Sequence, residues 1–329
     1  MNPFKSPARV VVCVSLSTLA AALASGCSSA GRSTVGSQAF DPPPMSAEIA
    51  RTLPAFDGTG RSLTWTEVLD LASASDVIVV GEQHDDPGAH AIELALVEDL
   101  LERHPGSMVS MEMLERHEQA DLDAYLADEI DLATFIERTG SARWSGSQRW
   151  EDSYGRLVEA AKARGGRVVA ANAPRKYVRR ARVEGYEALE SLPEEERVLF
   201  DLPERLDEGA YRERFREIMT SMREANGNPP PSEESIENLL RSQMVWDATM
   251  AASIANALAD PDLPADAKVV HAVGRFHSDF EGGTILELAR LMPEARILVV
   301  SVTPDGVAPG DEDLGRADVL VFGGATDPD

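Results

Sequence analysis

The sequence contains little cysteine and has no excess of positive charge. Cys13 and Cys27 are the only cysteines among 329 residues, and both lie near the N-terminus. They cannot supply a disulfide framework or a cysteine-ligated metal centre to the folded part. Against 56 Asp and Glu there are 31 Lys and Arg, so the net charge of -25 would repel a phosphate backbone. We therefore expect no nucleic-acid partner.

Several catalytic and nucleotide-binding motifs are also missing. No Gly-x-Ser-x-Gly elbow is present, and no Gly-x-Gly-x-x-Gly segment or phosphate loop follows a predicted strand. The sequence therefore gives no support for acyl transfer by serine or cysteine, for dinucleotide binding or for P-loop phosphate chemistry.

The N-terminus has the pattern of a secretory signal. Lys5 and Arg9 precede an uncharged stretch, residues 10–23, that is too short to span a bilayer. We expect residues 1–26 to be removed. The segment Leu-Ala-Ser-Gly-Cys that ends at Cys27 resembles the lipobox of bacterial lipoproteins, and this resemblance implies a lipidated Cys27. An ordinary cleaved signal is the alternative.

Composition predicts where the folded domain begins and ends and what flanks it. Residues 27–62 are expected to form a tether rich in Ser, Gly and Pro, residues 63–322 the folded domain and residues 323–329 a frayed tail. A lipid anchor would place the domain on a membrane of the bacterial cell envelope. Ser28 stands where inner-membrane lipoproteins often carry aspartate, which favours the outer membrane.

Short β-branched runs alternate with amphipathic stretches, which predicts an α/β fold with a mostly parallel central sheet between helix layers. The expected strands are 77–80, 108–111, 168–171, 269–273, 297–300 and 319–322. A helix is predicted from Ala89 to Arg103. Residues 175–259 contain no strand candidate and are predicted to form an all-helical insertion, which could cap a site or serve as scaffold.

Polar residues follow four of the predicted strands. Because ligands of open α/β sheets bind beyond the carboxyl ends of the strands, these residues are expected to converge on one edge. They are Glu82, His84, Glu112, Asn172, Arg175 and His277. Imidazoles with carboxylates suit a transition metal or iron held in a porphyrin, and they also suit general acid and base chemistry.

Five ordered motifs between Leu63 and Ser301 carry a resemblance to a known family. They are Gly-Glu-Gln-His-Asp (81–85), Met-Glu-Met (111–113), Ala-Asn-Ala-Pro-Arg (171–175), the segment 243–251, and Gly-Arg-Phe-His (274–277) followed by Gly282-Gly283. Together they resemble the ChaN-like family of haem-binding uptake lipoproteins, in the Tiki superfamily. The resemblance implies haem binding, iron uptake and a lipid-anchored location. The family commonly has Gly-Asn-Gly-His in the last motif, so Arg275 and Phe276 are departures.

Three hypotheses remain open from the sequence. In the first, the protein binds haem through His84 or His277, with Tyr154, Tyr177 or Tyr186 as alternative phenolate ligands. Asn172, Arg175 and Arg179 would contact the cofactor, the two arginines as partners of its propionates. In the second, the residues Glu82, His84, Glu112 and His277 hold a divalent metal or catalyse hydrolysis, as in the Tiki proteases and erythromycin esterases of the wider superfamily. In the third, the fold only binds a partner. A homodimer and a haem-transport partner protein are further expectations.

Overall fold

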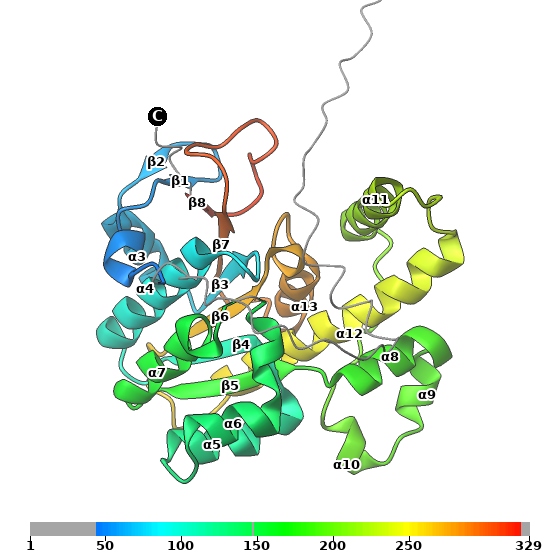
Figure 1. Cartoon of the computed structure of the whole chain (residues 1–329), viewed down its shortest axis with the longest axis horizontal. Helices are drawn as coiled ribbons and strands as arrows, with labels where there is room; N and C mark the ends of the chain where they lie inside the picture. Colours follow the sequence, from blue (N-terminus) through cyan, green and yellow to red (C-terminus); the bar gives the residue numbers. More distant parts are fainter. Residues whose placement is uncertain (1–43, 147, 324–329) are drawn as a thin grey trace, which may run out of the picture. The chain divides into compact units, whose positions relative to one another are not determined.

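A sheet of eight strands organises the computed structural model, which describes residues 44–146 and 148–323 (Figure 1). The strand order is β2-β1-β8-β7-β3-β6-β4-β5. Strands β3 to β8 pair in parallel, whereas β1 runs antiparallel to both β2 and β8. The strands are β1 (Ala55–Asp57), β2 (Ser62–Leu63), β3 (Val77–Glu82), β4 (Met108–Glu115), β5 (Arg167–Asn172), β6 (Val269–Gly274), β7 (Ile297–Thr303) and β8 (Val319–Phe322).

Helices cover both faces of this sheet. The α-helices are α2 (Ala47–Ala50), α3 (Trp65–Ala74), α4 (Pro87–Arg103), α5 (Gln119–Leu126), α6 (Leu132–Thr139), α7 (Gly155–Ala163), α8 (Arg175–Glu184), α9 (Tyr186–Glu190), α10 (Glu194–Arg197), α11 (Ala210–Ala225), α12 (Glu233–Leu258) and α13 (Gly283–Leu291). Short 3-10 helices are η1 (Arg116–Glu118), η2 (Ser141–Trp144), η3 (Trp150–Asp152) and η4 (Arg275–His277). One core includes residues of α3, α4 and α7, and the other those of α12 and α13.

The alternation of side chains along the strands explains the two cores. In β3, Ile78 and Val80 join the core of α4, whereas Val77 and Val79 face that of α12 and α13. Every residue of β3 is buried, as expected of a strand covered on both faces. Helix α4 starts at Pro87, where the missing N–H costs nothing, and Asp86 caps it by accepting from the N–H of Gly88.

The predicted fold is confirmed. All six expected strands are present, and residues 175–259 contain helices α8 to α12, which Figure 1 shows in green to yellow beside the sheet. A third, smaller core of α8, α9 and α12 residues stabilises the insertion. No helix in the described part is long and apolar enough to cross a membrane.

Regular structure begins before residue 63, where the folded domain is predicted to start. Helix α2, strand β1 and the first residue of β2 fall within the expected tether, and β1 pairs with β8. These strands have three and two residues, so they are too short to show a periodic pattern. The signal, Cys27 and residues 324–329 of the expected tail lie outside the described residues.

Candidate functional site

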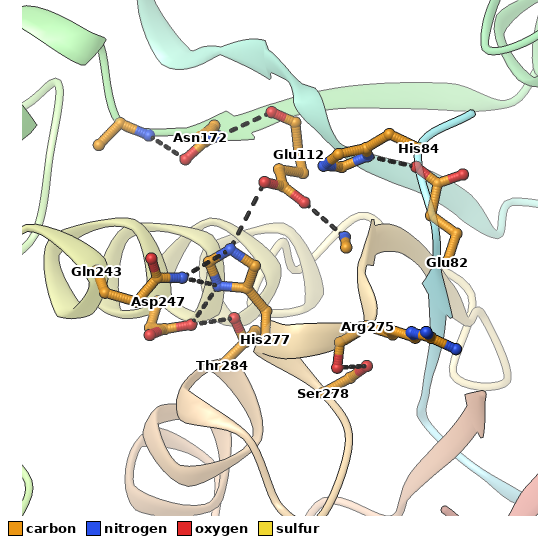
Figure 2. Close-up of polar contacts among 12 residues, drawn as sticks. Glu82, His84, Glu112, Asn172, Gln243, Asp247, Arg275, His277, Ser278 and Thr284 are labelled. Carbon is orange, nitrogen blue, oxygen red and sulfur yellow. Dashed lines mark hydrogen bonds and ion pairs between the residues drawn. The ribbon is translucent and has the colours of Figure 1, made fainter. Parts of the chain in front are cut away.

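The predicted polar residues meet at the carboxyl edge of four neighbouring strands. In the order β3-β6-β4-β5, these strands carry Glu82, Gly274 and the η4 turn after it, Glu112, and Asn172. Met111 pairs with Ala170 and Glu115 with Asn172, so five positions of β4 oppose three of β5, and β4 is irregular where Glu112 lies. Figure 2 shows the carboxylate of Glu112 between the rings of His84 and His277.

Glu82 and His84 form the first of two carboxylate–imidazole pairs. Nδ1 of His84 lies 2.7 Å from Oε1 of Glu82, and the hydroxyl of Tyr154 donates to the same oxygen at 2.6 Å. Glu82 is buried, whereas 21% of the His84 side chain is exposed. With Nδ1 held by Glu82, Nε2 is the ring nitrogen of His84 that is available to a ligand.

The charges around this pair favour its ionised form. Burial alone would lower the pKa of His84, but the hydrogen bond to Glu82 and the charge of Glu112 raise it to about 9. Burial alone would raise the pKa of Glu82, but the neighbouring imidazoles, His90 first, lower it to about 2. Near neutral pH the pair is therefore a carboxylate and an imidazolium.

His277 and Asp247 form the second pair. Nδ1 of His277 lies 2.6 Å from Oδ1 of Asp247, which comes from α12 and is fully buried. The hydroxyls of Tyr211 and Thr284 donate to the same carboxylate at 2.7 and 2.9 Å. Burial would lower the pKa of His277, but the charges of Asp247 and Glu112 raise it.

The two glycines after η4 allow this second pair to form. A Cβ on Gly282 would clash with the backbone of His277, and one on Gly283 would clash with the carboxylate of Asp247. The Gly282-Gly283 motif thus permits a close approach between the start of α13, η4 and α12.

Glu112 links the two pairs. Its Oε2 accepts from the N–H of Gly274 at 2.6 Å, and its Oε1 lies 3.6 Å from Nε2 of His277. Asn172 donates from Nδ2 to the carbonyl of Glu112 and accepts from the N–H of Ala173, so it joins the ends of β4 and β5. Asn172 is therefore a structural residue of this edge.

The space beside Nε2 of His84 depends on a glycine. A Cβ on Gly274 would lie 3.2 Å from Nε2 of His84 and 3.4 Å from Oε2 of Glu112. Glycine at this position thus lets the imidazole of His84 and the carboxylate of Glu112 both approach the end of β6 closely.

The predicted metal ligands do not form a ready-made metal site. Within residues 44–146 and 148–323, the group of three or more His, Cys, Asp or Glu with donor atoms all within 4.8 Å of one another is Glu115, His117 and Glu118. Glu82, His84, Glu112 and His277 do not form such a group. The residues of the Glu115 cluster already pair with Arg143, at 3.1 Å from Glu115 and 3.7 Å from Glu118.

Trp144 contacts both His84 and Arg175, the arginine that is predicted to pair with a haem propionate. The rings of Trp144 and His84 make an edge contact, with 5.2 Å between their centroids. The guanidinium carbon of Arg175 lies over the Trp144 ring, 4.8 Å from its centroid. A pocket of about 340 Å³ adjoins Arg175 and is lined by Glu115, His117, Pro174, Arg175, Lys176 and Leu199. Arg179 is exposed on α8 and does not line this pocket.

The three tyrosines have different surroundings. Tyr154 reaches the site, but it is fully buried and its hydroxyl donates to Glu82, so it serves to hold that carboxylate. Tyr177 donates to Glu196 and Tyr186 to the carbonyl of Arg241, both within the helical insertion. The structure does not bring Tyr177 or Tyr186 to the strand edge.

Sequence reasoning missed the acid partner of His277. Asp247 and Gln243 lie one turn apart on α12, and Nε2 of Gln243 lies 3.0 Å from Nε2 of His277. The segment 243–251 is part of the family resemblance, but the motif alone does not show which of its residues contacts His277. A pair of polar residues at i and i+4 within this largely apolar segment is the signal that could have identified them.

One solved structure supports the fold. A search of curated proteins finds no match. The structure titled cofacial heme binding to ChaN of Campylobacter jejuni is 20% identical, with a TM-score of 0.58 over 82% of this chain and 95% of that one. An erythromycin esterase mutant in its open conformation is 15% identical, with a TM-score of 0.41 over 74% of this chain and 73% of that one.

The sequence itself shows the family. The family described as haem-binding uptake, Tiki superfamily, ChaN matches residues 68–288, which include both carboxylate–imidazole pairs, Glu112 and the helical insertion. The chain therefore belongs to the ChaN family of the Tiki superfamily.

Proposed function

We propose that the protein binds haem at the strand edge, with Nε2 of His84 as the ligand of the iron, and that it serves haem or iron acquisition. Membership of the haem-binding uptake family carries the proposal. His84 is the more exposed of the two anchored histidines, with 21% of its side chain accessible against 6% for His277. Histidine is a common haem ligand once its ring has lost its proton, and the bound haem would supply the iron to be carried.

Trp144 and Arg175 support the same position. The indole of Trp144 contacts His84, and the guanidinium of Arg175, which lies over the indole ring, can pair with a propionate. Nε of Arg175 is buried without a hydrogen-bond partner, and its nearest carboxylate, on Glu115, lies 3.7 Å away. Burial and the charge of Arg143 lower the pKa of Arg175, which means that its positive charge is poorly compensated. An anionic group in the adjoining pocket would compensate that charge and would itself be stabilised by it.

An absorption titration with ferric haem tests the proposal. The full chain in mild detergent should give a saturable, shifted Soret band at one haem per chain, against a blank of detergent alone. The band should be lost in His84→Ala and kept in His277→Ala, and Tyr154→Phe should leave the ligand in place. Binding that does not saturate, or that is the same in His84→Ala, would contradict the proposal.

Arg175→Ala tests the propionate partner. Loss of a charged hydrogen bond of about 1.5–3 kcal/mol should weaken haem binding about 10- to 100-fold without moving the Soret maximum. Arg179→Ala is the matched control, because Arg179 lies on the exposed face of the same helix.

The location of the protein is proposed from the sequence. Cys27 would carry the lipid that anchors the protein to the outer membrane, facing an extracytoplasmic space. Cell fractionation of the wild type and Cys27→Ala tests this, since the variant should leave the membrane fraction.

A homodimer and a haem-transport partner would be sought by sedimentation and by transfer of haem between proteins.

Metal-dependent hydrolysis is a second candidate, because two carboxylate–imidazole pairs converge on Glu112. Such an arrangement can hold a metal or move a proton. Glu82→Gln separates the two functions. It should abolish hydrolysis of ester or peptide substrates with added Zn²⁺ or Mn²⁺, whereas its amide oxygen can still accept from His84 and haem binding should persist.

A further inference from the structure

The pocket of about 340 Å³ beside Arg175 lies where the helical insertion meets the sheet. Its lining comes from the end of β4 with η1, from the start of α8 and from the turn after α10. The lining residues are Glu115, His117, Pro174, Arg175, Lys176 and Leu199. Sites for small molecules have volumes of about 300–1,000 Å³, so this pocket fits a ligand at the small end of that range.

The walls of the pocket are held in place by Arg116, which connects η1 to the helical insertion. Its guanidinium lies 2.7 Å from the carboxylate of Asp201 and donates to the carbonyl of Thr249 at 2.9 Å. It also donates to the hydroxyl of Ser253 at 2.8 Å. Because these contacts fix the two sides of the pocket relative to each other, the pocket is preformed, which lowers the entropy cost of binding a ligand.

Three side chains bring nitrogen donors to the pocket. Arg175 lines it with a guanidinium whose Nε is buried and has no hydrogen-bond partner among the described residues. Nζ of Lys176 lies 3.8 Å from the carboxylate of Glu196, beyond hydrogen-bond length, and 66% of the Lys176 side chain is exposed. His117 is half-exposed, and its Nδ1 lies 3.5 Å from Oε2 of Glu115. All three side chains can therefore donate to a ligand.

The charges at the pocket favour an anion over a metal cation. Glu115, His117 and Glu118 place donor atoms within 4.8 Å of one another, as a metal site would require. However, the guanidiniums of Arg143 and Arg175 lie 3.1 and 3.7 Å from Oε1 of Glu115, and both would repel a cation. An anion beside Arg175 would instead compensate a positive charge that shares Glu115 with Arg143.

The lining also selects among anions. Glu115 lines the pocket as a buried carboxylate, so a doubly charged phosphate would be repelled more strongly than a singly charged carboxylate. The planar guanidinium of Arg175 matches the geometry of a carboxylate. Pro174 and Leu199 form an apolar part of the wall, against which the carbon skeleton of a ligand would pack. These features suit a small organic acid with an apolar body.

We propose that this pocket is a binding site for a small monocarboxylic acid, with Arg175 as the main partner of the carboxylate and with Lys176 and His117 as further donors. The site needs neither iron nor His84. It shares Arg175 with the proposed function but does not rest on it, because the site would bind a free acid in protein that contains no haem.

Calorimetric titration of the haem-free full chain in mild detergent with benzoate tests the proposal. Binding should saturate at millimolar concentration or below, with one benzoate per chain. Benzyl alcohol, which lacks the charge, and inorganic phosphate should each bind about tenfold more weakly or worse. Equal binding of benzyl alcohol would overturn the proposal, and tighter binding of phosphate would overturn the assignment to a carboxylate.

Substitutions test whether the benzoate lies in this pocket. Arg175→Ala should weaken benzoate binding about 10- to 100-fold, as expected for loss of a charged hydrogen bond. Lys176→Ala and His117→Ala should each weaken it about two- to fivefold, because both side chains are more exposed. Arg179→Ala is the matched control, since Arg179 is exposed on the same helix outside the pocket, and it should leave benzoate binding unchanged.

Two results would overturn the placement of the site. One is unchanged binding in both His117→Ala and Lys176→Ala, which decides the question even if Arg175→Ala fails to fold. The other is equal weakening in Arg175→Ala and Arg179→Ala. Benzoate binding without haem binding would refute the proposed function alone, whereas the absence of saturable benzoate binding would overturn this inference whatever the haem titration shows.

Discussion

Haem affinity should depend steeply on pH because the proposed ligand carries a proton that the iron must displace. The pKa of His84 is raised to about 9, mainly by the hydrogen bond to Glu82 once burial is overcome. At pH 7 only about one chain in 100 then has a neutral His84. Iron binds Nε2 only when the ring has lost that proton, so the affinity should rise about tenfold per pH unit between pH 7 and 9.

The assay is the Soret titration repeated at half-unit steps from pH 6 to 10. The dissociation constant should fall about 50-fold from pH 7 to 9 and level off above pH 9. Protoporphyrin without iron is the control for the remaining contacts, and it should bind with little pH dependence. His84→Ala should bind weakly with a flat profile. A flat profile in the wild type, or the same slope in His84→Ala, would refute the reasoning.

Three other substitutions or conditions follow from the same structure. Gly274→Ala should weaken haem binding without a loss of thermal stability, because the new Cβ would lie 3.2 Å from Nε2 of His84. Gly283→Ala should lower the free energy of unfolding by about 1–3 kcal/mol in urea titrations, because its Cβ clashes with Asp247. Burial lowers the pKa of His271 to about 3, so the free energy of unfolding should fall as pH drops from about 6.5 towards 3, less steeply in His271→Gln; an equal slope would contradict this.

The strands and the polar residues at their carboxyl ends could be predicted, because both are visible in short stretches of the sequence. Continuous apolar runs such as 77–80 read as buried strands, and the residue after each run must lie at the strand end. The convergence of Glu82, Glu112 and His277 followed from parallel topology alone. Strands β1 and β2 escaped prediction because they are held by pairing with β8 and have too few residues to show a pattern.

The partners of the site residues could not be predicted in the same way. Asp247 lies 30 residues before His277, on a helix whose rotation is set by packing against the sheet. His90 appears in the sequence as one more residue of an amphipathic helix. Its contact with Glu82 depends on the tilt of α4, which follows from the core that it shares with β3. Such contacts are tertiary, and propensity or periodicity does not encode them.

The two Gly-x-x-His segments look equivalent in the sequence, and the structure makes them different. Both histidines are held at Nδ1 by a buried carboxylate, so both direct Nε2 towards the region of Glu112. Around His277, Asp247 is fixed by Tyr211 and Thr284, and Gln243 also contacts the ring. His84 instead lies beside Gly274 and is partly accessible. An incoming ligand would have to displace Gln243 to reach His277, whereas His84 needs only to lose a proton, and this difference favours the proposed role of His84 over one for His277.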